Sequence, residues 1–170
     1  MKNIILFGFM GTGKTAIGKT LAEKLNMKFV DMDDLIEEHE GTAISEIFAT
    51  KGEPYFRRVE SKVAEDVAGR TGLVVATGGG VVLNCENVRA LESTGTGVCL
   101  NASPEIICER VRDETHRPLL DVEDPLKRIR EMLEARKPYY ARVKHQLNTD
   151  QLSVEEAVKR IIEIVETPGD

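Results

Sequence analysis

The 170-residue sequence contains no tryptophan and few aromatic residues of any kind, 5% in all. It lacks any apolar run near the roughly 20 residues that span a bilayer, so we expect no membrane segment, and strand-like sequence from Asn3 onward indicates no signal peptide. Its three cysteines, Cys85, Cys99 and Cys108, stand far apart without C-x-x-C spacing. This spacing argues against a zinc site and favours buried, inert thiols in a reduced compartment.

An excess of positive charge is also missing. The formal net charge is −6, which argues against general affinity for nucleic acid. The length corresponds to about one domain with a full hydrophobic core. Composition therefore favours a compact enzyme, in which particular arginines and lysines must supply the positive charge for any anionic ligand.

The most informative segment is Gly8–Thr15, which reads G-x-x-x-x-G-K-[ST]. The apolar run Ile4–Phe7 before it predicts a buried strand, and Ile17, Leu21 and Leu25 after it recur at helical spacing. Strand, glycine loop and helix N-terminus together predict a phosphate-binding loop, whose backbone N–H groups face phosphate oxygens. The alternative, a chance match in a glycine-bearing turn, is disfavoured by these flanks.

This loop predicts the groups that hold the phosphates of ATP and their metal ion. Lys14 is expected to reach the β- and γ-phosphates, and the Thr15 hydroxyl is expected to bind Mg²⁺. The predicted nucleotide-binding residues of the loop are Gly11, Thr12, Gly13, Lys14, Thr15 and Ala16.

Strand-like and helical segments alternate along the chain, which predicts an α/β fold of three layers with a parallel sheet between helices. We expect strands over 3–8, 28–31, 73–76, 97–100 and 143–147. We expect helices over 14–26, 33–39 and 53–70, and further helices capped by Thr42, Asn84, Ser103 and Ser153. No repeat or linker divides the sequence, so we expect a single domain over 1–170.

Two carboxylates, Asp31 and Asp33, follow the second predicted strand. Because they are two residues apart, both can point the same way at the carboxyl edge of the sheet, beside the phosphate-binding loop. One could hold Mg²⁺ through water, and the other could accept a proton from an attacking hydroxyl. Helix capping is the alternative, and we prefer it only for Asp34.

Three further features predict contacts to a small anion. Arg57 and Glu60 share a helix face, so the carboxylate can orient the guanidinium. The alternative is an ordinary solvated ion pair, and Arg136 taken alone is equally ambiguous. Gly78–Gly80 after a buried strand predicts direct contact between backbone and ligand, with a flexible turn as the alternative. The polar segment about 112–124, which contains Arg117, predicts a lid, with an ordinary surface loop as the alternative.

In order and spacing, these segments resemble the shikimate kinase family over nearly the whole chain. The motifs are G-x-x-G-x-G-K-T at 8–15, D-x-D at 31–33, F-R-R-x-E at 56–60, G-G-G at 78–80, R-P-L-L at 117–120 and R-x-P-x-Y at 136–140. The first motif marks only the wider class of P-loop enzymes. F-R-R-x-E together with G-G-G and R-P-L-L is much more specific.

The resemblance implies a P-loop kinase whose five-stranded parallel sheet has the order 2-3-1-4-5. It implies that ATP, with Mg²⁺, phosphorylates the 3-hydroxyl of shikimate in the cytoplasmic pathway to chorismate and aromatic amino acids. It also implies a monomer whose partners are ATP and shikimate, with no nucleic acid or membrane. The shikimate-binding helical region would span about 32–62 and the lid about 112–124.

Site residues are implied position by position. Asp33 matches the candidate base, Asp31 the water-mediated magnesium partner, and Arg110 the arginine against the adenine ring. Arg57 and Arg136 match the pair that holds the substrate carboxylate, and Gly79 matches a backbone contact to it. The implied catalytic residues are Asp33, Lys14 and the lid residue Arg117, and the implied substrate contacts are Asp33, Arg57, Gly78, Gly79, Gly80 and Arg136.

Some features depart from the family or leave alternatives open. Asn148 stands where many members have aspartate, and no proline that would pack against the adenine can be located. Within the site, Thr77 at the end of the third strand is expected to bond to Asp31 and orient it. A sister kinase, acting on gluconate or a nucleoside monophosphate, would share the loop and a lid. A nucleotide-dependent switch or silent binding module would bind ATP without acceptor-stimulated turnover.

Overall fold

Five parallel strands form one sheet in the computed structural model, which describes residues 1–112 and 122–167. The strands are β1 (Asn3–Gly8), β2 (Lys28–Asp31), β3 (Leu73–Ala76), β4 (Gly95–Asn101) and β5 (His145–Asn148). Their order in the sheet is β2-β3-β1-β4-β5, and every pairing is parallel. The expected α/β fold and strand order are therefore confirmed.

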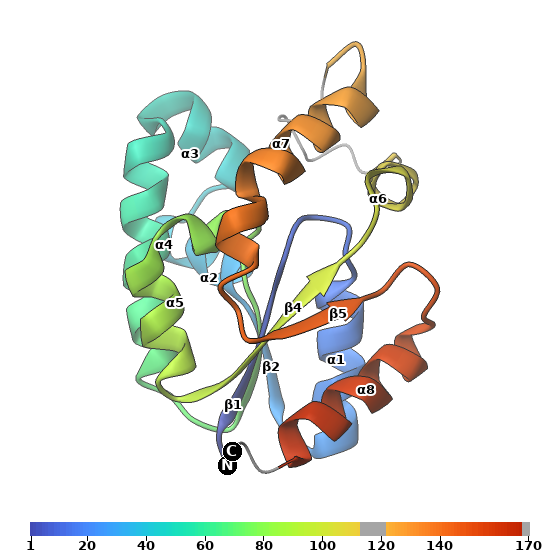
Figure 1. Cartoon of the computed structure of the whole chain (residues 1–170). Coiled ribbons are helices and arrows are strands. Elements are labelled where there is room, and N and C mark those ends of the chain that lie inside the picture. The colour runs from blue at the N-terminus through green and yellow to red at the C-terminus, as the bar shows by residue number, and fades with distance from the viewer. Residues whose placement is uncertain (113–121, 168–170) are drawn as a thin grey trace.

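Helices cover both faces of this sheet (Figure 1). They are α1 (Lys14–Leu25), α2 (Met32–Glu40), α3 (Ile44–Lys51), α4 (Glu53–Ala68), α5 (Cys85–Glu92), α6 (Pro104–Val111), α7 (Pro125–Tyr140) and α8 (Val154–Glu166), with a 3-10 turn, η1 (Val81–Leu83). In Figure 1, α1 and α8 lie together on one side of the sheet, and α2 to α5 gather on the other. This arrangement gives the three expected layers.

The central strand β1 divides the hydrophobic core in two. Because successive side chains of a strand face opposite sides, Ile4 and Leu6 pack into the cluster formed with α1 and α8. Ile5 and Phe7 pack into the larger cluster, which α2 to α7 cover. Both clusters hold β1 rigidly at its carboxyl end, where the phosphate-binding loop begins.

Local capping differs from the sequence prediction at two helices. Ala43 occupies the N-cap position of α3 in place of Thr42, and the Glu37 carboxylate accepts from the Ile44 N–H at 3.1 Å. The prediction for Thr42 was wrong because a carboxylate from the preceding helix replaces the local hydroxyl. Ser103 occupies the N-cap position of α6, but its side chain makes no cap hydrogen bond.

Cysteine burial also differs in part from the expectation. Cys99 is buried in β4 and Cys108 is half-buried, but Cys85 is exposed. The reason is that Asn87 and Leu91 make the buried face of α5, so its first residue faces solvent. Within 1–112 and 122–167, no helix is both long and apolar enough to cross a membrane.

Candidate active site

The phosphate-binding loop folds around the Lys14 side chain. Gly11 and Gly13 have φ values of +75° and +98°, which L side chains rarely adopt, and Gly13 is the N-cap of α1. These conformations bring loop carbonyl groups toward Lys14, whose Nζ donates to the oxygens of Gly8 at 2.6 Å and Phe9 at 2.9 Å. The predicted sequence of strand, glycine loop and helix is therefore confirmed, and the contact of Lys14 with phosphate stays a prediction.

Thr15 connects the loop to the acidic cluster after β2. Its hydroxyl donates to Oδ2 of Asp31 at 3.1 Å, and Ala16 lies beside it in the first turn of α1. Oδ1 of Asp31 accepts from the Asp33 N–H at 2.9 Å and so caps α2. The expected link from Thr77 to Asp31 was wrong, because the Thr77 hydroxyl donates to the Leu6 carbonyl oxygen instead.

The other end of the loop is held by Thr149, which follows β5. Thr149 is buried, and its hydroxyl bonds to the Thr12 carbonyl oxygen at 3.1 Å and to the Asn101 carbonyl oxygen at 3.2 Å. Arg110, from α6, donates to the Gly11 carbonyl oxygen at 3.0 Å and to the Thr149 carbonyl oxygen at 3.2 Å. Three segments far apart in the sequence therefore meet at one side of the loop.

The predicted substrate side forms around the glycine run after β3. A methyl group on Gly78 would lie 3.0 Å from both Oδ1 of Asp33 and Oε2 of Glu60. A methyl group on Gly80 would collide with the Arg57 guanidinium. Two carboxylates from α2 and α4 and one guanidinium therefore converge on the run.

Gly79 joins this cluster to the phosphate-binding loop. A methyl group there would lie 3.5 Å from Nη1 of Arg136 and 3.5 Å from the backbone nitrogen of Met10. The Arg136 guanidinium also lies 5.6 Å from the ring centre of Phe9, within the range of a cation–π contact. The substrate side and the phosphate side are therefore neighbours, as transfer between two bound molecules requires.

Glu60 is the most buried charged group of the cluster, with 2% of its surface exposed. Its Oε1 accepts from Nη1 of Arg57 at 2.9 Å, whereas Oε2 has no hydrogen-bond partner among the described residues. Burial raises the pKa of Glu60, and the guanidiniums of Arg57 and Arg136 oppose this shift. Nη2 of Arg57 also lies 3.3 Å from Oε1 of the exposed Glu53, so two carboxylates orient the Arg57 guanidinium.

The structure thus brings together all of the predicted site residues within its described part. Arg117 and most of the segment 112–124 lie outside the described residues. The Asn148 side chain closes a turn after β5, since its Oδ1 accepts from the Asp150 N–H at 2.9 Å. Thr149 was not predicted, although its place just after a strand, at the carboxyl edge of the sheet, is a usable signal.

Comparison with known proteins agrees with this geometry. Residues 10–166 match the family model described as shikimate kinase. Shikimate kinase of Thermodesulfovibrio yellowstonii is 47% identical over 153 residues, covering 90% of this chain and 88% of that protein. The corresponding enzyme of Symbiobacterium thermophilum is 44% identical over 171 residues, covering 99% and 98%.

Solved structures give the same result. Shikimate kinase from Acinetobacter baumannii in complex with shikimate has a TM-score of 0.92 and 36% identity, covering 97% of this chain and 93% of that one. A gluconokinase from Sinorhizobium meliloti has a TM-score of 0.58 at 17% identity, which shows a shared fold alone. The family model and these identities show that the chain belongs to the shikimate kinase family.

Proposed function

We propose that this chain transfers the γ-phosphoryl group of ATP to the 3-hydroxyl of shikimate, giving shikimate 3-phosphate and ADP on the route to chorismate and aromatic amino acids. The observation that carries the proposal is the convergence on Gly78–Gly80, where Asp33, Arg57 and Arg136 gather beside the phosphate-binding loop. A small carboxylate with several hydroxyl groups matches guanidinium groups and a carboxylate arranged in this way.

Each side chain has a distinct proposed task. Arg57 and Arg136 bind the shikimate carboxylate, with a backbone contact from the glycine run. Asp33 binds the hydroxyl groups and accepts the proton of the attacking 3-hydroxyl as its oxygen bonds to phosphorus. Lys14 neutralises charge on the transferred group, and Arg117 of the lid is proposed to add to this. Arg110 is proposed to lie against the adenine.

The residues around Thr15 fit Mg²⁺. A hydroxyl and a carboxylate lie side by side there, since Thr15 Oγ1 and Asp31 Oδ2 are 3.1 Å apart, and both are hard oxygen donors. Mg²⁺ takes few protein ligands when phosphate and water oxygens complete its shell, so Thr15 would bind it directly and Asp31 through water. Bound there, the ion would offset negative charge on the phosphates.

Further features are proposed from the sequence and the family resemblance. They are a monomeric state, a cytoplasmic location, a single domain over 1–170, a shikimate-binding helical region at about 32–62 and a lid at about 112–124. The packing of α2, α3 and α4 against one another supports the helical region as a unit.

The test measures ADP release from ATP and Mg²⁺ with shikimate, gluconate or AMP as the acceptor. We expect stimulation by shikimate alone. Stimulation by gluconate or AMP instead would assign the chain to a sister activity. ATP binding without stimulation by any of the three would reduce the function to a nucleotide-binding module.

A further inference from the structure

Tyr140 contacts the glycine run from the C-terminal end of α7. Its hydroxyl donates to the Gly79 carbonyl oxygen at 2.5 Å, and only 5% of the residue is exposed. Tyr140 ends α7 and stands four residues after Arg136, so both side chains leave the same face of the helix. One helix end therefore supplies a guanidinium and a hydroxyl to Gly79.

The hydroxyl controls the direction of a backbone donor. A peptide unit is planar, and the described residues contain no cis peptide bond, so the Gly79 carbonyl and the Gly80 N–H point in opposite directions. Holding the carbonyl toward Tyr140 therefore turns the Gly80 N–H away from α7. Gly80 is also the residue that packs directly against the Arg57 guanidinium.

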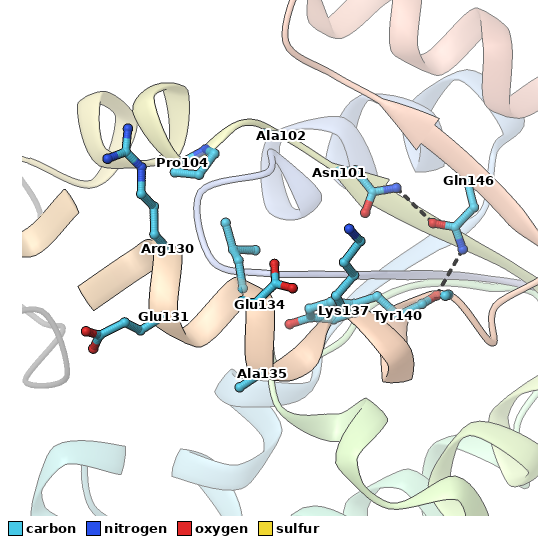
Figure 2. A pocket seen from close by; sticks show the side chains of 12 residues that line it. Asn101, Ala102, Pro104, Arg130, Glu131, Glu134, Ala135, Lys137, Tyr140 and Gln146 are labelled. Atoms are coloured by element: carbon cyan, nitrogen blue, oxygen red, sulfur yellow. Dashed lines mark hydrogen bonds between the residues drawn. The ribbon is translucent and has the colours of Figure 1, made fainter. Parts of the chain in front are cut away.

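Tyr140 is itself held in place by the edge of the sheet (Figure 2). The Gln146 amide on β5 donates to the carbonyl oxygens of Tyr140 at 2.9 Å and Val143 at 2.6 Å. The Asn101 amide at the end of β4 donates to Oε1 of Gln146 at 2.8 Å. Asn101, Tyr140 and Gln146 line a cavity of about 1190 Å³, and none of the predicted site residues lines it.

The Tyr140 hydroxyl also keeps its proton over the working pH range. Burial raises its pKa to about 12, although the neighbouring Arg136 guanidinium opposes the shift. The donor to Gly79 is therefore permanent. A glycine run has more backbone freedom than any other, so an anchor of this kind removes conformations that the run would otherwise visit.

We propose that Tyr140 is a positioning residue for substrate binding, which anchors the Gly79 carbonyl and so holds Gly79, the backbone contact that the family resemblance implies for the substrate carboxylate, beside Arg136. This inference rests on the proposed function, because shikimate supplies that carboxylate. A backbone segment that is already held in place costs no reorganisation when the anion binds, so the benefit falls on substrate affinity.

The test compares Tyr140→Phe with Tyr139→Phe. The neighbouring Tyr139 is half-buried beneath the Arg142 guanidinium, so it controls for loss of a hydroxyl at this helix end. We expect Tyr140→Phe to raise KM for shikimate roughly tenfold, the equivalent of one good hydrogen bond. The kcat value and KM for ATP should stay within about twofold, and Tyr139→Phe should change neither substrate constant.

Two outcomes would overturn this role. One is an unchanged shikimate KM in Tyr140→Phe, and the other is an equal rise in both substrate KM values, which would indicate general loosening. If wild-type enzyme itself shows no shikimate-dependent ADP release, the proposed function fails rather than the role of Tyr140.

A second measurement avoids reliance on the folding of Tyr140→Phe. The sequence has three tyrosines, Tyr55, Tyr139 and Tyr140, so 3-fluorotyrosine labelling gives three fluorine resonances, which Tyr55→Phe and Tyr139→Phe assign by elimination. The Tyr140 resonance should move when shikimate is added, while that of Tyr55 should not. A Tyr140 resonance that stays in place at saturating shikimate would contradict the proposal.

Discussion

Three carboxylates in the site have different surroundings and therefore different chemistry. Asp31 already caps α2 and accepts from Thr15, so its oxygens are engaged in holding structure. Asp33 faces the glycine run on the substrate side. Glu60 lies deeper and supports Arg57. Residue type alone does not separate these tasks, because all three are acids near one sheet edge.

The first prediction concerns Asp33. Asp33→Asn keeps the size of the side chain and removes its capacity to take a proton, so kcat should fall by roughly a hundredfold or more. ATP affinity, measured by calorimetric titration, should be unchanged. Asp34→Asn is the matched control, because Asp34 is exposed in the same helical turn. Equal losses of kcat and ATP affinity would exclude Asp33 from the chemistry.

The second prediction concerns the pH dependence of stability. Burial raises the pKa of Glu60 above its usual 4.5, so the folded state holds this proton more tightly than the unfolded state. The resulting stability is present below pH 4.5 and is lost as pH rises through the folded-state pKa. Wild type should therefore lose unfolding free energy relative to Glu60→Gln as pH rises.

Urea unfolding at several pH values from about 4 to 8 tests this. Glu53→Gln is the control, because it removes the exposed partner of the same arginine. If the unfolding free energy of wild type instead increased relative to that of Glu60→Gln with rising pH, the Arg57 charge would outweigh burial.

At the scale of elements, residues at the ends of the strands form the candidate site, and the sequence patterns predicted this location. Buried strands followed by glycines or acids predict ligand contacts at the carboxyl edge. Gly78 and Asp31 do lie at that edge, and their contacts to a ligand stay a prediction. The contact between Thr149 and Thr12 could not be predicted from sequence, because it depends on how β4 and β5 pair although residues 102–144 separate them in the chain. For the same reason, local motifs could not reveal that Glu37 replaces Thr42 at the start of α3.

The third prediction concerns this contact. Thr149→Val keeps the shape and removes the hydroxyl, so the Thr12 carbonyl oxygen loses this donor, whereas the Asn101 carbonyl oxygen still accepts from the backbone N–H of residue 149 at 2.8 Å. Unfolding free energy should fall by about 1–3 kcal/mol, and KM for ATP should rise roughly tenfold, whereas KM for shikimate should not change. Thr50→Val on the exposed face of α3 is the control. A rise confined to KM for shikimate would contradict the assignment of Thr149 to the nucleotide side.

At the scale of the whole molecule, alternation of strands and helices was enough to predict a layered parallel sheet. It was not enough to predict the order β2-β3-β1-β4-β5, which came from the family resemblance. Many orders satisfy the same alternation, and the choice depends on how the side chains on both faces of the sheet pack against the helices. Side-chain packing of that kind has no local signature.

The fourth prediction concerns the smaller core. Leu21 in α1 is fully buried between helix and sheet. Leu21→Ala should lower unfolding free energy by about 2–5 kcal/mol, because the cavity cannot close fully between rigid layers. Leu83→Ala, at a residue 37% exposed, should change it by less than about 0.5 kcal/mol. Equal effects of the two substitutions in urea unfolding would contradict the packing described for α1.

The central place of β1 has a consequence for the order in which the protein assembles during synthesis. Its partners are β3 and β4, with Ile4 beside Val74 and Asn3 beside Gly95, and the buried Asn3 amide also bonds to Arg70 and Thr94. As the chain leaves the ribosome, β1 emerges first but must wait for about 90 further residues before both neighbours exist. The nucleotide site is thus encoded earliest and completed late, so a nascent chain should bind ATP only after β4 has emerged.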